Sequence, residues 1–174
     1  MIFTGFKRKS NQIFFNKRVV EVQNNSNNIS SEKVKKILIF LDDDGSEKDQ
    51  IKRELLALFQ VSENDLRIVV FSKSISKDQV TEEIITPKDF GWYGKVKSEK
   101  LKNILTNTCD LLINYSKVDN IYTNTLLLQY KAAFKVGFSH LDNRLYDLLI
   151  SCNSIDISLF NKELKKYLKI LGKI

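Results

Sequence analysis

The stretch KILIFLDDDGSEKD, residues 36–49, decides the fold class of this chain. After Lys36 it runs as an uninterrupted apolar segment to Leu41, which is typical of a strand buried on both faces of a sheet. Residues 42–45 form a turn, and residues 46–49 have the Ser-x-x-Asp pattern that begins a helix. A buried strand that leads directly into a helix is the repeating unit of a parallel α/β sheet.

The same alternation of strand and helix continues along the rest of the chain. Further apolar strands are expected at 66–71, 110–115, 135–138 and 146–151. Helices are expected at 46–58, 98–105 and 120–134, and from 158 to 171. Residues 72–97 are expected to be irregular, with room for a short strand at 81–86. With right-handed crossovers, this order predicts a three-layer, Rossmann-like, doubly wound α/β domain with a mainly parallel sheet of about five strands.

Length and composition are those of a single soluble domain. The chain has 174 residues, of which 43% are hydrophobic and 28% are charged, and it is long enough to bury its own core. Its apolar stretches are far shorter than the roughly 18 residues of a membrane span, and no signal peptide follows Met1, so we expect a cytoplasmic protein. Cys109, Cys152 and one histidine predict neither a disulfide framework nor a zinc site.

The positive charge is concentrated at the two ends of the chain. Of the formal net charge of +7, residues 1–36 contribute +6, residues 37–161 contribute −3 and residues 162–174 contribute +4. Cationic ends on a mildly acidic body predict contacts with phosphate, with RNA as the favoured source and lipid as the second alternative. The candidate nucleic-acid-binding residues are Lys7, Arg8, Lys9, Lys17, Arg18, Lys162, Lys165, Lys166 and Lys169. The alternative is that these lysines only solvate helix surfaces, as expected from an AT-rich coding bias.

Three segments are expected along the chain. Residues 1–21 read as a basic, amphipathic helical arm that docks either on the body or on a partner. Residues 22–31 are polar and cannot bury enough apolar surface to order themselves, so they are expected to be a linker. Residues 32–174 form the single Rossmann-like domain. We therefore expect that residues 1–21 can be removed without unfolding the body.

Candidate ligand-binding residues lie in the loops that follow the expected strands, where doubly wound sheets bind ligands. The loop at 42–46 has one glycine and three carboxylates instead of a phosphate-binding glycine pattern. Asp42, Asp43 and Asp44 could hold Mg²⁺, but capping of the following helix is the favoured interpretation. Asn114, Tyr115 and Asn120 line the loop after a later strand and could form hydrogen bonds with a ligand. We predict no metal site and no cofactor.

The loop DFGWYGK, residues 89–95, is the most distinctive segment. It places Trp92 and Tyr93 between two glycines that permit unusual backbone angles, with lysines nearby. These aromatic side chains could stack on a base or a sugar. The alternative, which we favour, is a plug that folds over an end of the sheet and buries Trp92.

Several segments resemble a family of small uncharacterised bacterial proteins. They are DFGWYGK (89–95), DLLINY (110–115), KVGF (135–138), YDLLIS (146–151) and FNKELKKYLKILGKI (160–174). This resemblance covers most of the chain after residue 31 and implies no activity. Residues 110–138 are also similar to part of the N-terminal half of heptosyltransferase-type glycosyltransferases. Those enzymes need a second Rossmann-like half, for which 174 residues leave no room.

These observations predict a non-enzymatic binding module whose basic terminal segments engage RNA, a ribonucleoprotein or another acidic partner, with the N-terminal arm also available to a protein partner. The alternative is a small-ligand protein or enzyme that binds a nucleotide or sugar in a pocket where Asp42, Asp44, Trp92 and Tyr115 converge. No catalytic residue is identified, because His140 has no neighbouring base or nucleophile in the sequence.

Overall fold

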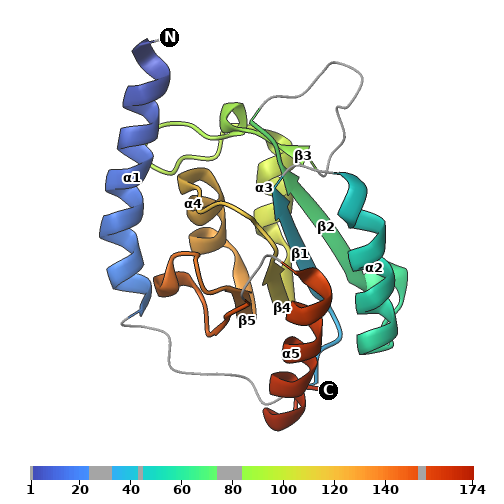
Figure 1. Ribbon diagram of the computed structural model, residues 1–174. Helices are drawn as coiled ribbons and strands as arrows, with labels where there is room; N and C mark the ends of the chain where they lie inside the picture. Colours follow the sequence, from blue (N-terminus) through green and yellow to red (C-terminus); the bar gives the residue numbers. More distant parts are fainter. Residues whose placement is uncertain (1, 24–32, 43–44, 74–83, 153–155) are drawn as a thin grey trace.

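A six-stranded, all-parallel sheet forms the centre of the molecule. The computed structural model describes residues 2–23, 33–42, 45–73, 84–152 and 156–174 (Figure 1). The strands are β1 (Ile37–Asp42), β2 (Leu66–Phe71), β3 (Ile84–Ile85), β4 (Thr108–Asn114), β5 (Lys131–Phe138) and β6 (Leu148–Ile150). Their order is β3-β2-β1-β4-β5-β6, so the strand order reverses between β1 and β4. The predicted doubly wound, Rossmann-like α/β fold is confirmed, with six strands instead of about five.

Helices cover both faces of this sheet. Helices α2 (Gly45–Phe59) and α5 (Ile157–Ile170) pack on one face, and α1 (Ile2–Gln23), α3 (Glu99–Thr106) and α4 (Ile121–Gln129) pack on the other (Figure 1). The central strands β1, β2 and β4 contribute side chains to both cores because successive residues point to opposite faces. In β1, for example, Ile39 belongs to the α2/α5 core, whereas Leu38 and Phe40 belong to the opposite core. The result is the three-layer arrangement that apolar strands of this kind require.

Two predicted boundaries differ from the structure by four residues or more. Helix α4 ends at Gln129 instead of 134, and β5 begins at Lys131 instead of 135. The first residues of β5 are polar or small and partly exposed, so they lack the apolar signal of a buried strand. They are extended because Lys131 and Ala132 pair with Thr108 and Cys109 of β4. The pairing partner, which is distant in sequence, therefore sets this boundary.

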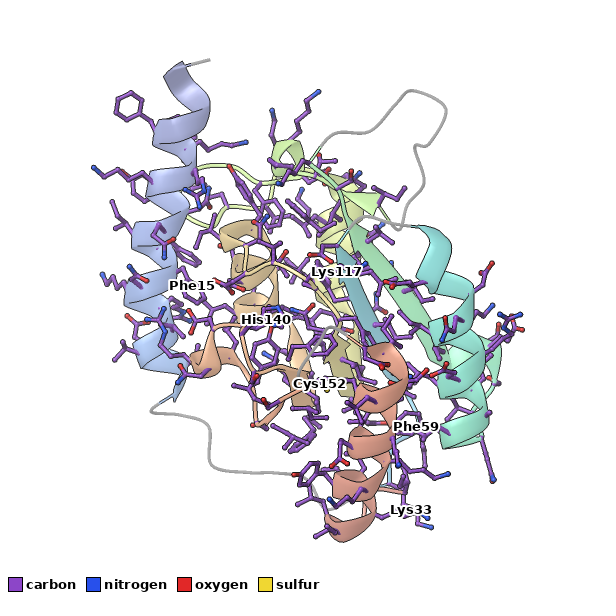
Figure 2. All side chains as sticks on the ribbon, in the orientation of Figure 1. Phe15, Lys33, Phe59, Lys117, His140 and Cys152 are labelled. Atoms are coloured by element: carbon purple, nitrogen blue, oxygen red, sulfur yellow. The ribbon has the colours of Figure 1, made fainter. Side chains whose placement is uncertain are left out.

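The N-terminal segment forms a long helix that packs on the body. Phe15 and Val19 of α1 are buried in the core that α1 shares with α3 and α4, and Phe15 points from α1 toward the body (Figure 2). Val22 and Gln23, which we predicted to start the linker, still belong to α1, and residues 24–31 of that linker lie outside the described residues. Among the described helices, none combines the length and apolarity that a bilayer crossing needs.

Candidate functional site

The carboxyl ends of β1 and β4 are joined by a carboxylate at the point where the strand order reverses. Asp42 ends β1, and its Oδ2 accepts hydrogen bonds from the backbone N–H groups of Lys117 (2.7 Å) and Val118 (3.0 Å). The Lys117 ammonium adds an ion pair with Glu47 of α2, at 3.0 Å. Burial raises the pKa of the Asp42 carboxyl, and the hydrogen bonds from Lys117 and Val118 oppose that rise. Two backbone donors that could meet an anionic ligand therefore already bind Asp42.

Asn114 and Tyr115 lie inside the fold beside this junction. The buried Asn114 side chain donates to the Tyr146 hydroxyl at 2.6 Å and accepts from the Ser116 N–H at 2.9 Å. The Tyr115 hydroxyl donates to Asn161 of α5, and burial holds its pKa well above the ordinary value. Both side chains thus brace the end of β4 against its neighbours, and neither faces solvent. His140 is exposed, and its ring stacks on Phe138.

The loop of residues 89–95, called the aromatic loop below, packs on helix α1. Its tryptophan does not cover the sheet. Trp92 and Tyr93 are 43% and 56% exposed, whereas Phe90 is buried. Phe90 packs on Tyr122 with ring centroids 5.3 Å apart and forms a bridge with Val96. The prediction that Trp92 is the buried plug is therefore wrong. The backbone pairing of Phe90 with Val96 turns Phe90 inward and leaves the tip of the loop in solvent.

The predicted ligand residues do not form one pocket among the described parts of the chain. Asp42 and Asn114 end neighbouring strands, and Tyr115 follows on the face that α5 covers. The loop with Trp92 and Tyr93 is bonded to α1, which covers the opposite face: the Tyr93 N–H donates to Ser10 Oγ at 3.2 Å. The sheet thus separates Tyr115 from the aromatic loop. Asp44 lies outside the described residues.

Helix α5 presents four lysines on one side. Lys162, Lys165, Lys166 and Lys169 are all exposed, and their spacing of three, four and seven residues places them along one face of the helix. Lys166 is 3.3 Å from Glu163, the only acidic residue of the final thirteen. For the other three lysines, no ion pair is found with any residue that the structure describes.

The basic residues of α1 have two different environments. The Lys7 ammonium donates to the backbone carbonyls of Pro87 (2.6 Å) and Phe90 (3.1 Å) and lies 5.9 Å from the centre of the Tyr122 ring. Burial, followed by the charge of Lys97, lowers the pKa of Lys7. Lys7 thus fastens α1 to the body. The remaining four cations are exposed on the helix: Arg8, Lys9, Lys17 and Arg18.

The two basic helices do not form one continuous surface. Helix α1 lies over α4 on one face of the sheet, and α5 lies beside α2 on the other (Figure 1).

A family model described as a family of unknown function, DUF6913, matches residues 7–171. The chain belongs to DUF6913. This match runs from Lys7 in α1 to Leu171 after α5, so it covers all of α5 and all of α1 except its first five residues.

Membership of DUF6913 confirms the predicted resemblance to a family without an assigned activity. No curated protein and no solved structure matches the chain. The similarity of residues 110–138 to heptosyltransferases therefore gains no support from these comparisons.

The sequence did not point to a cavity of about 180 Å³ at the amino ends of the strands. It is lined by Lys36, Ile37, Leu38, Asn64, Asp65, Arg67, Asn107, Thr108, Cys109 and Tyr130. Burial raises the pKa of the Cys109 thiol to about 11, so this thiol is protonated at neutral pH and is a poor nucleophile. The lining comes from four separate segments without a motif, so only the fold brings it together. Among the described residues, no cluster of His, Cys, Asp and Glu could hold a metal ion.

Proposed function

We propose that this DUF6913 protein is a non-enzymatic RNA-binding module and that the lysine face of α5 contacts the phosphate backbone. The observation that carries the proposal is the row of exposed cations on α5, of which Lys162, Lys165 and Lys169 have no ion-pair partner among the described residues. Lysines without a carboxylate partner bind phosphates most favourably, because their binding releases condensed counterions and breaks no existing ion pair.

Helix α5 is held firmly enough to present these lysines as a fixed row. Its opposite side buries Phe160, Leu164 and Leu168 in the core. The Asp156 side chain caps the helix by accepting from the Leu159 N–H at 3.0 Å. From Lys162 to Lys169 the helix rises about 10 Å, which is long enough for contacts with successive phosphates. Little ordering of the protein is then required on binding.

Neutralising the lysine face tests the proposal. In the full chain, the triple variant Lys162→Gln, Lys165→Gln, Lys169→Gln is compared with the wild type for binding to a single-stranded uridine homopolymer at several salt concentrations. We expect weaker binding at every concentration. If three phosphate contacts are lost, the slope of log K against log salt becomes shallower by about 2, since each contact with a single strand contributes about 0.7.

A matched control removes three lysine charges elsewhere. Lys52 pairs with Glu63, Lys102 pairs with Glu99, and Lys131 lies exposed at the start of β5. The variant Lys52→Gln, Lys102→Gln, Lys131→Gln has the same net charge as the test variant, so we expect it to keep the wild-type slope. Absence of RNA binding by the wild type, or equal losses in both triple variants, would reject the proposal.

A further inference from the structure

Helix α1 has apolar side chains on two opposite faces, and its docking on the body uses only one of them. The inner face buries Phe15 and Val19. The outer face exposes Phe6, Ile13 and Val20 at 59%, 54% and 53%. These three residues are seven apart, and seven residues are close to two helical turns, so they form one line along the helix. Packing among the residues that the structure describes does not explain this second line.

Basic residues flank the outer apolar line. At 100° per residue, Lys9 lies on one side of Ile13 and Lys17 on the other, and both are exposed. Arg8 and Arg18 lie further round toward the body and are also exposed. Glu21 is the only acidic residue of α1, and it is placed near the end of the helix, where it pairs with Arg18. Around Ile13, the outer face is thus apolar in the middle, with one lysine at each border.

Helix α1 is also the outermost layer of the described structure. It lies over α4, which separates it from the sheet, and no described element lies beyond it (Figure 1). The helix is held in one rotation, because the buried Asn11 side chain donates to the Gly91 carbonyl at 3.0 Å and accepts from the Gly94 N–H at 2.8 Å. The outer apolar line is thus fixed in a direction that points away from the protein and can meet a flat surface along its whole length.

We propose that the outer face of α1 binds the surface of an anionic lipid bilayer, with the helix lying in the plane of the interface. An apolar line with basic borders is the pattern of interfacial helices: the apolar side chains enter the boundary between headgroups and acyl chains. Lysine stems can lie along that boundary while their ammonium groups stay among the anionic headgroups. An RNA backbone would match the lysines but would leave Phe6, Ile13 and Val20 without an apolar partner. This inference concerns a different surface from the α5 lysines and does not depend on RNA binding.

The size of the apolar line predicts binding that requires anionic lipid. Three partly exposed side chains bury little area, so the apolar contribution alone is weak. Each lysine or arginine near an anionic surface strengthens binding about fivefold. We therefore expect measurable binding to vesicles that contain phosphatidylglycerol, much weaker binding to pure phosphatidylcholine, and a decrease as salt is raised.

Vesicle flotation with the full chain tests the inference. Mixed phosphatidylglycerol/phosphatidylcholine vesicles are compared with pure phosphatidylcholine vesicles. We expect Ile13→Asp to abolish flotation with the mixed vesicles, because it places a negative charge in the middle of the apolar line. The double variant Lys9→Gln, Lys17→Gln is expected to bind about 25-fold more weakly. Ile13 is exposed, so circular dichroism should give Ile13→Asp the same thermal midpoint as the wild type.

Two matched controls locate the binding surface. Ile170→Asp makes the same change at an isoleucine of α5 that is 72% exposed, and Lys52→Gln, Lys102→Gln removes two lysine charges outside α1. Both controls are expected to float like the wild type. Failure of the wild type to bind the mixed vesicles would overturn the inference. Undiminished flotation of Ile13→Asp, or losses as large in the controls as in the α1 variants, would also overturn it.

Discussion

Gly94 shows how closely the aromatic loop packs on helix α1. Its φ is +72°, in the left-handed region that side chains with a Cβ rarely adopt. A Cβ at this position would overlap the Phe14 ring of α1. The N–H of the same glycine donates to the buried Asn11 side chain, so the backbone cannot move away without losing that hydrogen bond. Both the conformation and the contact therefore require glycine.

We expect Gly94→Ala to lower the free energy of unfolding by about 2 kcal/mol or more, from backbone strain and the overlap with Phe14. Gly5→Ala is the matched control. Gly5 lies within α1 with no other side chain close to its Cβ position, so alanine there should raise stability by about 0.5–1 kcal/mol. Urea unfolding of both variants gives the two values. Equal stabilities would contradict the packing of the loop on α1.

Individual side-chain roles were the least predictable feature of the site. Lys7 looked like one more phosphate-binding lysine, because a charge pattern cannot show that two carbonyls eighty residues away will accept its hydrogen bonds. Asn114 and Tyr115 were correctly expected at the end of a strand. Their hydrogen-bond partners, Tyr146 and Asn161, come from later segments, and only the three-dimensional structure reveals them.

At the scale of elements, apolar runs predicted those strands that are buried on both faces. Strand β2 was predicted with its observed boundaries, and helix α3 begins after Ser98, which caps it as expected. The two-residue strand β3 lies within residues 81–86, where a short strand was predicted. Only its pairing with Val70 and Phe71 of β2 fixes its position. Elements that depend on a partner distant in sequence cannot be located from local pattern alone.

Helix α1 is the element whose role changed most. We expected that residues 1–21 could be removed without unfolding the body. The structure instead places Phe15 and Val19 in the core beside α4, and removing them would expose that core to water. The amphipathic pattern correctly indicated a helix. It could not show which apolar residues face the body, because α1 carries two apolar faces.

Two phenylalanines of α1 allow the faces of the helix to be compared directly. Phe15 is 1% exposed, with the Arg144 guanidinium 5.1 Å from its ring centre, whereas Phe6 is 59% exposed. We expect Phe15→Ala to cost about 3–5 kcal/mol of folding free energy, and Phe6→Ala to change it by less than about 0.5 kcal/mol. Denaturant unfolding measures both. In vesicle flotation, we expect Phe6→Ala to bind more weakly than the wild type. A large loss of folding stability in Phe6→Ala would contradict this comparison, because it would show that the outer face of α1 is packed.

At the scale of the whole molecule, the sheet keeps the two basic helices on opposite sides. If α5 binds RNA and α1 binds anionic lipid, one molecule can bind both at once. We expect the wild type to carry a labelled RNA into the floating vesicle fraction. The α5 triple variant should float without RNA, and Ile13→Asp should bind RNA without floating. Competition between RNA and vesicles for the wild type would show instead that the two ligands share one surface.

The edges of the sheet have a consequence for the behaviour of the protein at high concentration. The border strands β3 and β6 contain only two and three residues. Unpaired border strands are the places where one chain can template the hydrogen bonding of another, and longer borders make fibril growth easier. Within the described part of the chain, β3 and β6 therefore give another chain only two or three residues to pair with, so these two strands by themselves are poor templates for amyloid-like stacking.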